Sequence, residues 1–570
     1  MITTRKISTL IIAVLLIAGN TGFAQTVKDT IPKNWHQLDR ATTGYYGISL
    51  DKAYTFIGTQ KRKDKTGILH VFSKKKKIKS KTVLVAVIDS GIDTTHEDLK
   101  AILWVNPKEI PGNGIDDDND GHIDDVHGWN FLGGKDDKNV NTDSYEASRV
   151  YNNLKKKFGS TVPDSTEANK SEWADIALYA KAKAKIAGDV NPDEIEFIKN
   201  MLPRLLNGDS VISKDLGKKE YSCKDLANYT SEDKDATTVK NFMLTVCKGN
   251  GSDDITNKEL LEQMDGELRK ADAANNPPEE YRKEVVQDDE TNINDRNYGN
   301  ADITAGTPFH GTHCSGIIGA IRNNGKGVDG IADNVRIMMV RAVPDGDEHD
   351  KDIANAIRYA TDEGAEVISM SFGKDFSPQK QWVDDAVRYA ESKGVLLVHA
   401  AGNDAKNVDS ADNFPNPNFI DGNGRATNWI TVGASGDPKN GGITASFSNY
   451  GKKEVDVFSP GVQIYSSIPT TNNYGTASGT SMATPVVAGI AALILEYYPT
   501  LSAEQVKYAI ENSVQVPDVK VKIPGSDDLV NLSDISKTGG IVNAYAALKV
   551  ASKLKGERKK TDNQFIIPKN

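Results

Sequence analysis

The feature that most constrains the fold is an alternation of short apolar strands with amphipathic helices. Four β-branched or apolar runs each end on small or polar residues, and helix-like stretches closed by glycine separate the later runs. The strand-like runs lie at 82–93, 335–343, 366–373 and 395–404, and the helix-like stretches at 352–364 and 382–394. This alternation predicts an α/β fold in which helices flank a mainly parallel sheet on both faces. Functional groups should then collect at the carboxyl ends of the strands.

A different composition interrupts this pattern between residues 135 and 300. The block is rich in Lys, Asp, Glu and Asn, has helix-like stretches at 171–188 and 192–208, and lacks strand-like runs. A structureless loop of that length would be improbable inside a compact domain. We therefore expect 135–300 to form a mostly helical inserted subdomain, either a surface decoration or a lid that controls access. Residues 82–134 and 301–550 should form the α/β domain.

The two ends of the chain carry signals of their own. Arg5 and Lys6 precede a short apolar run, and small residues end at Ala24, which is typical of a cleaved signal peptide over 1–24. Residues 25–81 are then an N-terminal arm or a short pro-segment, and 551–570 a loose C-terminal tail. We expect an exported protein, either secreted or periplasmic.

Charge and hydropathy narrow the range of partners. The formal net charge of −10 argues against nucleic acid and against anionic membranes as natural partners. No uninterrupted apolar run of about 18 residues follows the leader, so we expect no membrane span. The sequence leaves the oligomeric state open.

The cysteines allow one disulfide without requiring it. Cys223 and Cys247 lie in the same polar region, and an oxidising compartment would permit them to pair, but the sequence does not fix their connectivity. Cys314 lies inside an apolar helix pattern and is expected to be a small buried hydrophobe.

Four polar residues stand where strands end or helices begin, and together they meet the needs of a serine hydrolase. Ser481, in "GTSMATP", opens an apolar helix, and Asp89 ends the first strand in "DSG". His310 opens "HGTHCSGIIGA", and Asn403 follows a strand in "AAGND". A nucleophilic serine needs a base, a carboxylate that orients the base and donors for the oxyanion. The sequence supplies one candidate for each role.

In this order and with these flanks, the four segments resemble the signatures of the subtilisin-like serine peptidases. The resemblance covers about residues 82–134 and 301–550 and is interrupted by the helical block. It implies a three-layer subtilisin-like fold. It also implies a secreted serine endopeptidase that acts on proteins or peptides.

The resemblance assigns a role to each of the four residues. Ser481 would attack the scissile carbonyl, while His310 would accept its proton and later protonate the leaving amine. Asp89 would hold the imidazole in the useful tautomer. The side-chain amide of Asn403 and the backbone N–H of Ser481 would receive the oxyanion at a helix N-terminus.

The resemblance also implies where the substrate side chain binds. In the family, the segment matching "SFG" lies beside the substrate backbone and, with the segment matching "AAG", walls the primary specificity pocket. The corresponding residues are Ser371, Phe372, Gly373, Ala400, Ala401 and Gly402. Neither segment contains a charged residue, so we expect a large apolar or aromatic side chain before the cleaved bond.

Other interpretations of the same residues stay open at this point. His310 and His313 are spaced to share a helix face and could bind zinc, although the H-E-x-x-H pattern of zinc peptidases is absent. Asp89 and Ser481 could each merely cap a turn or a helix. A binding module that kept the fold but lost activity would be a function of a different class.

The acidic stretch "DDDNDGHIDD" at 116–125 predicts a structural calcium site. The candidate ligands are Asp116, Asp118, Asp120, Asp124 and Asp125. Carboxylates this close repel one another unless a cation lies among them, and hard oxygen ligands favour Ca²⁺. The pattern D-x-D-x-D-G is the first half of a calcium loop, but the twelfth position is His127 rather than glutamate. A solvated acidic loop without an ion is the alternative.

Overall fold

The computed structural model describes residues 31–59, 80–189, 191–250, 255–273, 276–306, 308–437, 440–470 and 472–558. The expected signal peptide at 1–24 lies outside these residues, as do parts of the expected arm (25–81) and tail (551–570). The described chain divides into two compact units. Unit 1 comprises Thr142–Glu280 and Asp345–Asp347, and unit 2 comprises Ile31–Asn141, Tyr281–Pro344 and the described part of Glu348–Asn570.

An eight-stranded sheet forms the centre of unit 2. Its strands are β1 (Val83–Asp89), β2 (Gly128–Asn130), β3 (Val335–Arg341), β4 (Val367–Met370), β5 (Leu396–Ala400), β6 (Trp429–Asp437), β7 (Asn440–Thr444) and β8 (Val457–Pro460). The order across the sheet is β2-β3-β1-β4-β5-β6-β7, with β8 paired to β6. These pairings are parallel except that of β6 with β7. The expected α/β fold with a mainly parallel sheet is confirmed.

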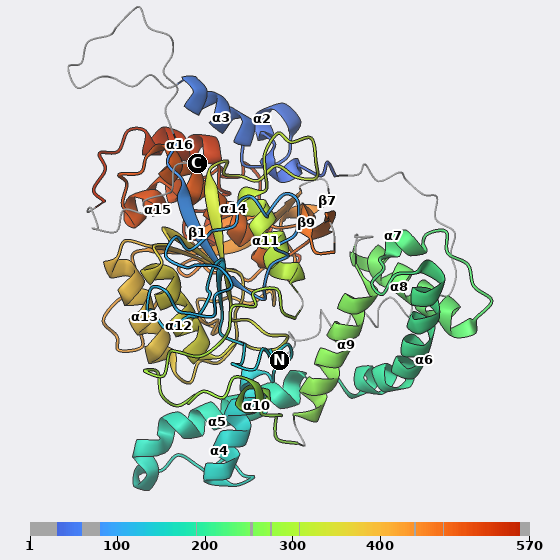
Figure 1. Cartoon of the computed structure of the whole chain (residues 1–570). Helices are drawn as coiled ribbons and strands as arrows, with labels where there is room; N and C mark the ends of the chain where they lie inside the picture. Colours follow the sequence, from blue (N-terminus) through green and yellow to red (C-terminus); the bar gives the residue numbers. More distant parts are fainter. Residues whose placement is uncertain are drawn as a thin grey trace, which may run out of the picture. The chain divides into compact units, whose positions relative to one another are not determined.

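Helices bury both faces of the sheet because successive side chains of a strand point to opposite faces. In β1, one core takes Val83, Val85 and Val87, and the other takes Leu84, Ala86 and Ile88. The first face is covered by α11 (Phe309–Gly319), α14 (Thr480–Tyr497), α15 (Ala503–Glu511) and α16 (Ala544–Ala551), and the second by α12 (Asp350–Asp362) and α13 (Lys380–Ser392). These helices and the central β1 are labelled in Figure 1. The result is three layers.

Shorter elements complete unit 2. They are η1 (Trp35–Gln37), α2 (Arg40–Thr43), α3 (Leu50–Thr59), α10 (Tyr281–Val285), β9 (Ile464–Ile468), β10 (Asn473–Ala477), β11 (Val521–Lys522), β12 (Leu529–Val530) and η3 (Leu532–Asp534). β9 pairs with β10, and β11 with β12, in two antiparallel ribbons.

Helix α14 is apolar along most of its length. By length and composition it could cross a membrane, but 89% of its 18-residue apolar window is buried inside the structure. Its side chains pack against β1, β4, β5, β6 and β8. It is therefore the core helix of unit 2.

The described part of the N-terminal arm, residues 31–59, belongs to the core of unit 2. Trp35, Leu50 and Ala53 are fully buried in the same core as α14. The Trp35 indole N–H donates to the backbone carbonyl of Val462 at 3.0 Å. Burial of this kind is typical of a permanent part of a fold.

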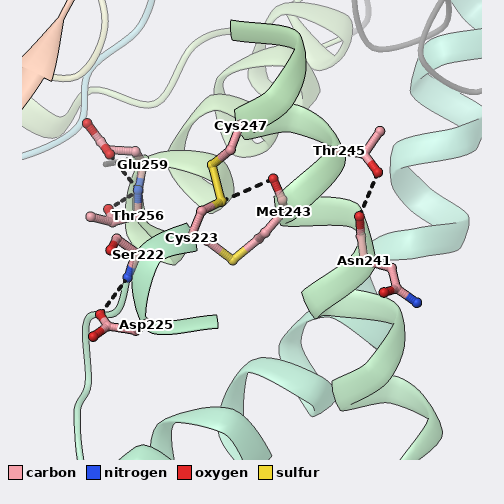
Figure 2. The surroundings of a disulfide bond; sticks show 9 residues. All are labelled: Ser222, Cys223, Asp225, Asn241, Met243, Thr245, Cys247, Thr256 and Glu259. Atoms are coloured by element: carbon pink, nitrogen blue, oxygen red, sulfur yellow. Dashed lines mark hydrogen bonds between the residues drawn. A yellow bond between two sulfur atoms is a disulfide. The ribbon is translucent and has the colours of Figure 1, made fainter. Parts of the chain in front are cut away.

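Unit 1 is helical, with no strand among its described residues. Its helices are α4 (Glu146–Phe158), η2 (Glu167–Glu172), α5 (Trp173–Asp189), α6 (Pro192–Leu216), α7 (Cys223–Leu226), α8 (Lys234–Asn250) and α9 (Asn257–Asp272). Cys223 and Cys247 form a disulfide that joins α7 to α8, buried among apolar side chains of α6, α8 and α9 (Figure 2). The pairing that the sequence left open is thus made in the structure.

The insertion is shorter than its composition suggests. Residues 135–141 and 281–300 belong to unit 2, where Val140, Val286 and Tyr298 are buried in the core beneath α12. The Tyr298 hydroxyl donates to Asp352 at 2.6 Å. Their burial could not be inferred from composition because most of their residues are polar.

Buried ion pairs explain how so polar a segment can be buried. The Arg282 guanidinium lies 2.7 Å from the carboxylate of Asp288 and also pairs with Asp352. The Lys351 ammonium lies 2.5 Å from Asp288. Charges taken out of water are tolerated when each has an opposite partner and hydrogen bonds.

Replacement of Trp35 tests whether the arm is part of the fold. Trp35→Ala should lower the free energy of unfolding by roughly 3 to 5 kcal/mol, because a fully buried aromatic side chain leaves a cavity. Denaturant unfolding followed by fluorescence, in a Ser481→Ala background that prevents self-digestion, measures the change. Trp173→Ala, at a Trp that is 36% exposed, serves as the control with a much smaller loss. A loss below about 1 kcal/mol for Trp35→Ala would show that the arm packs loosely.

Candidate active site

Asp89 and His310 are in direct contact. β1 ends at Asp89, and the Nδ1 atom of His310, in the first turn of α11, lies 2.8 Å from its Oδ1 atom. The Ser90 backbone N–H donates to the same oxygen at 2.7 Å, so the carboxylate is held from two sides. A Cβ on Gly311 would lie 2.1 Å from the backbone oxygen of Gly91, and glycine therefore permits α11 to approach the end of β1.

The Asp89 carboxylate controls the titration of His310. Burial favours the neutral imidazole, but the charge of Asp89 and its hydrogen bond outweigh that effect and raise the pKa of His310 above its ordinary value. Asp89 is 2% exposed and the His310 side chain 36%. Since Nδ1 is bonded to Asp89, Nε2 is the ring nitrogen left to exchange a proton with a substrate or a nucleophile.

Ser481 lies in the first turn of α14, next to the same cluster. Its hydroxyl donates to the backbone oxygen of Ser371 at 3.0 Å rather than to His310. The Cys314 thiol donates to the backbone oxygen of Ser481 at 3.4 Å. Cys314 lies one turn after His310, and the polar atoms of Asp89, His310 and Cys314 lie within 4.8 Å of one another. The structure therefore brings Ser481 beside the pair, with its hydroxyl turned to a neighbouring carbonyl.

Asn403 follows β5 and reaches the N-terminus of α14. Its Oδ1 atom accepts hydrogen bonds from the Thr480 backbone N–H and from the Thr480 hydroxyl, both at 2.9 Å. Because a backbone N–H can only donate, these contacts identify Oδ1 as the amide atom that faces Thr480 and leave Nδ2 as the donor of the amide. A Cβ on Gly479 would lie 3.5 Å from both Asn403 Nδ2 and the Ser481 backbone nitrogen. The two donors therefore flank one space, which the glycine leaves open.

The expected pocket walls follow two neighbouring parallel strands. Ser371 to Gly373 follow β4, and Ala400 to Gly402 lie at the end of β5. A Cβ on Gly373 would lie 2.8 Å from the Oδ1 atom of Asn413, and a Cβ on Gly402 3.5 Å from it. Asn413 Nδ2 donates to the backbone oxygen of Ala400 at 3.3 Å. An amide side chain thus lies between the two walls.

The sequence contains no signal for Asn413. It lies in an irregular segment rich in asparagine and proline. Its position beside the pocket walls becomes visible only in the structure, where this segment lies against the chain that follows β4. A pair of backbone hydrogen bonds makes that contact, with Lys374 and Phe414 each donating to the other at 2.9 and 2.8 Å.

His313 does not form a metal site with His310. It is fully buried, its Nε2 atom lies 3.3 Å from the backbone oxygen of Gly475, and burial together with His310 lowers its pKa to about 3. The described residues near His310 that could bind a metal are Asp89 and Cys314 instead. Burial and then Asp89 raise the pKa of the Cys314 thiol far above its usual range, so this thiol stays neutral. It behaves as the buried small side chain that the sequence predicts.

Two groups of carboxylates in the described chain could hold a cation, and both include Asp118. The first joins Asp118 to Asp116 and Glu109, and the second joins it to Asp120 and Glu363. Glu109 and Glu363 were not expected from the acidic stretch. Glu109 lies a few residues before the stretch, and Glu363 follows α12, far along the chain.

The structure does not bring Asp124 and Asp125 into either group. The Asp124 carboxylate accepts backbone N–H bonds from residues 112, 113 and 114 at 2.7 to 3.2 Å. Asp125 is fully buried, and its carboxylate accepts hydrogen bonds from Asn106 at 2.7 Å and from Tyr359 at 2.5 Å. Both carboxylates therefore make hydrogen bonds within the protein that stabilise the conformation of the loop.

Glu363 is the member of these two groups whose surroundings best fit a bound cation. Its side chain is 3% exposed, and its Oε2 atom has no hydrogen-bond partner among the described residues. Burial, and then the negative charges of Asp120 and Asp118, raise the pKa of Glu363 to about 7. The positive charge of Lys108 opposes this shift. The Lys108 ammonium lies 3.0 Å from Asp118 and 3.4 Å from Glu363, which compensates only part of the negative charge. Oxygen donors in this arrangement suit Ca²⁺.

Comparison with known proteins identifies the family. A model of the subtilase family matches residues 80–539. Thermitase of Thermoactinomyces vulgaris is 38% identical over 240 residues, which are 42% of this chain and 74% of that protein. An extracellular protease of Xanthomonas campestris is 33% identical over 264 residues, 43% of this chain and 41% of that protein. A solved structure of proteases from Pseudoalteromonas arctica has 31% identity and a TM-score of 0.35, covering 44% of this chain and 73% of that one. Because the family match spans most of its length, the chain belongs to the subtilase family and is a serine-type endopeptidase.

Proposed function

We propose that this protein is an exported endopeptidase that hydrolyses peptide bonds in proteins through Ser481, His310 and Asp89, with Asn403 in the oxyanion hole. The observation that carries the proposal is the hydrogen bond of 2.8 Å between His310 and Asp89, located beside the first turn of α14. A base oriented by a buried carboxylate next to a helix-start serine is the arrangement that activates a hydroxyl.

In the proposed mechanism, the Ser481 hydroxyl leaves the carbonyl of Ser371 and turns to Nε2 of His310. As its oxygen bonds to the scissile carbonyl carbon, its proton passes to Nε2, and Asp89 stabilises the imidazolium. The oxyanion then accepts hydrogen bonds from Asn403 Nδ2 and the Ser481 backbone N–H, which flank one space. The imidazolium protonates the leaving amine as the C–N bond breaks, which leaves an acyl ester on Ser481. Water then attacks the ester carbonyl and gives a proton to His310, and His310 passes a proton to the Ser481 oxygen as the acid is released.

The pocket proposed for the side chain before the cleaved bond has walls at 371–373 and 400–402. Phe372, which is half-buried, supports the expected preference for a large apolar or aromatic residue. Asn413 adds an amide between the walls, so a side chain with a polar end, such as tyrosine, would also find a partner.

Export is proposed from the leader-like residues 1–24, and a relative named as an extracellular protease supports it. We propose that the leader is removed and that the segment from 31 to 59 stays with the catalytic domain, because its side chains belong to the core. The catalytic domain, the helical insertion and the C-terminal tail would keep the order expected from the sequence.

We propose a structural Ca²⁺ site at Asp116, Asp118 and Asp120, completed by Glu109 and Glu363. When bound, the ion would neutralise the clustered carboxylates and join the acidic loop to the end of α12. It would stabilise the fold by mass action and take no part in peptide hydrolysis.

Replacement of the nucleophile tests the central proposal. Ser481→Ala should abolish peptide hydrolysis and labelling by a serine-directed phosphonate, with an unchanged circular dichroism spectrum, because a triad acts as a unit. Asn403→Ala should retain labelling but lower kcat roughly a hundred- to thousandfold, the usual cost of losing one oxyanion donor. Substantial turnover by Ser481→Ala, or full activity of Asn403→Ala, would reject the assigned roles.

The pH profile tests the contact between Asp89 and His310. Catalysis requires neutral His310, whose pKa is raised, so kcat/KM should increase with pH through a midpoint above about 6.5. Asp89→Asn removes the negative charge that raises the pKa of His310, whereas the burial of His310, which lowers this pKa, persists. The midpoint should therefore move to lower pH, and activity should fall by orders of magnitude. The measurement is kcat/KM on a short chromogenic peptide from pH 4 to 9. An identical midpoint in both proteins would contradict the coupling.

Chelation tests the calcium site. In a Ser481→Ala background, removing calcium should lower the melting temperature by several degrees, since a site saturated to about 100 times its Kd contributes about 2.7 kcal/mol. Asp118→Asn and Glu363→Gln should each remove most of this sensitivity. Asp124→Asn is the matched control, because that carboxylate bonds backbone N–H groups and lies outside both groups. Equal melting curves with chelator and with millimolar calcium would exclude a structural calcium site.

A further inference from the structure

Arg341, the last residue of β3, is a buried arginine with no carboxylate in contact among the described residues. It is 1% exposed. Its Nε atom donates to the backbone oxygens of Ser90 and Ala305, both at 3.1 Å. Its terminal nitrogens donate to the backbone oxygen of Val140 at 2.7 Å and to the amide oxygens of Asn130 at 3.0 Å and Asn141 at 3.4 Å. All these acceptors are neutral.

The guanidinium keeps its charge in this surrounding. Burial lowers the pKa of Arg341 to about 10, and the charge of Asp302 opposes that effect, so the group stays positive at neutral pH. A charge taken out of water is costly unless its donors are bonded, and here hydrogen bonds to neutral oxygens replace the usual ion pair. This costly arrangement lies at the edge of the sheet where the proposed active site is found.

The acceptors of Arg341 belong to separate segments of unit 2 that meet at the carboxyl ends of parallel strands. In the register of the sheet, Arg341 is aligned with Asp89 at the end of β1 and with Asn130 at the end of β2. Ser90 begins the turn that follows β1. Because a planar guanidinium that reaches several acceptors fixes both position and orientation, Arg341 joins this turn to the surrounding segments.

The turn at Ser90 and Gly91 contacts both members of the pair of Asp89 and His310. The Ser90 backbone N–H donates at 2.7 Å to Asp89 Oδ1, the same oxygen that lies 2.8 Å from His310 Nδ1. On its other side, the Gly91 backbone oxygen packs against α11, since a Cβ on Gly311 would lie 2.1 Å from it. A shift of the turn would therefore change the direction of the carboxylate and its distance from the imidazole.

We propose that Arg341 is a positioning residue for peptide hydrolysis, which acts by fixing the turn at Ser90 and Gly91 against Asp89 and His310. This inference rests on the proposed function, because it takes Asp89 and His310 as members of the triad. Arg341 touches no reacting atom in this role. Its effect comes from the forked geometry, so a lysine that keeps the charge but offers a single ammonium group cannot replace it.

The test compares two buried arginines of unit 2. Arg341→Lys keeps the charge and removes the fork. Arg282→Lys is the matched control, since Arg282 is 4% exposed and bonded to Asp288 and Asp352 rather than to the turn. The endpoint of labelling by a serine-directed phosphonate counts the active sites. The rate of labelling, and kcat and KM on a short chromogenic peptide, are then compared per counted site, which removes any effect of a lowered folded fraction.

We expect Arg341→Lys to lower kcat and the labelling rate roughly ten- to a hundredfold with KM unchanged, the usual cost of a slightly misplaced catalytic group. Arg341→Gln, which buries no charge, should lose at least as much, so the test does not depend on one replacement folding. Arg282→Lys should lower the melting temperature and leave both rates per site as in the wild type.

Two results would overturn the proposal. One is a kcat and a labelling rate per site equal to those of the wild type in the Arg341 variants, since Arg341 would then serve stability alone. The other is an equal loss of both rates in Arg282→Lys, because any buried arginine would then have the same effect. If the phosphonate did not label the wild-type protein, the proposed function itself would fail, which is a different result.

Discussion

The burial of α14 is the constraint on which the active site depends. The helix packs against five strands, and its side chains from Met482 to Leu495 are buried, so it cannot shift along the sheet without exposing apolar surface. Only its first turn reaches the polar edge of the sheet, where β4 and β5 also end. Hydrophobic burial therefore brings Ser481 beside Ser371 and Asn403 without any need for polar attraction. Polar contacts then adjust orientation, as the hydrogen bonds of Asn403 to Thr480 show.

The same constraint explains why so much could be predicted from the sequence. Strand ends are marked by a change from apolar to small or polar residues, and helix starts by glycine and hydroxyl residues before an apolar run. Asp89 and Ser481 stand at such points, and parallel strands bring their carboxyl ends to one edge. The contact between Asp89 and His310 was expected only from the resemblance of their flanking sequences to those of the subtilisin-like peptidases. The direction of the Ser481 hydroxyl could not be predicted, because a rotamer is set by its neighbours and by the bound substrate.

What the sequence could not predict are contacts between segments that local patterns do not connect. Glu363 follows α12 as one more polar residue at a helix end, and only the fold brings it to the acidic loop. Asn413 is one of several asparagines in an irregular segment. The division of the chain into two units also gives the helical unit narrower limits than composition predicts, for a related reason. Polar segments such as 281–300 look exposed, yet their charges are neutralised in pairs, as in Arg282 with Asp288 and Asp352.

The contact between His310 and Asp89 makes opposite demands on stability and on catalysis. A raised pKa means that the folded state binds a proton more tightly than the unfolded state, so the ion pair stabilises the fold at low pH and this contribution is lost as pH rises through the folded pKa. In the proposed mechanism, proton transfer from Ser481 requires the neutral imidazole, and therefore the pH range in which this contribution to stability is lost. Stability at the working pH must therefore come from interactions that do not involve His310. The buried arm around Trp35 and the apolar contacts of α14 are independent of its protonation, and they hold the site in place while it works.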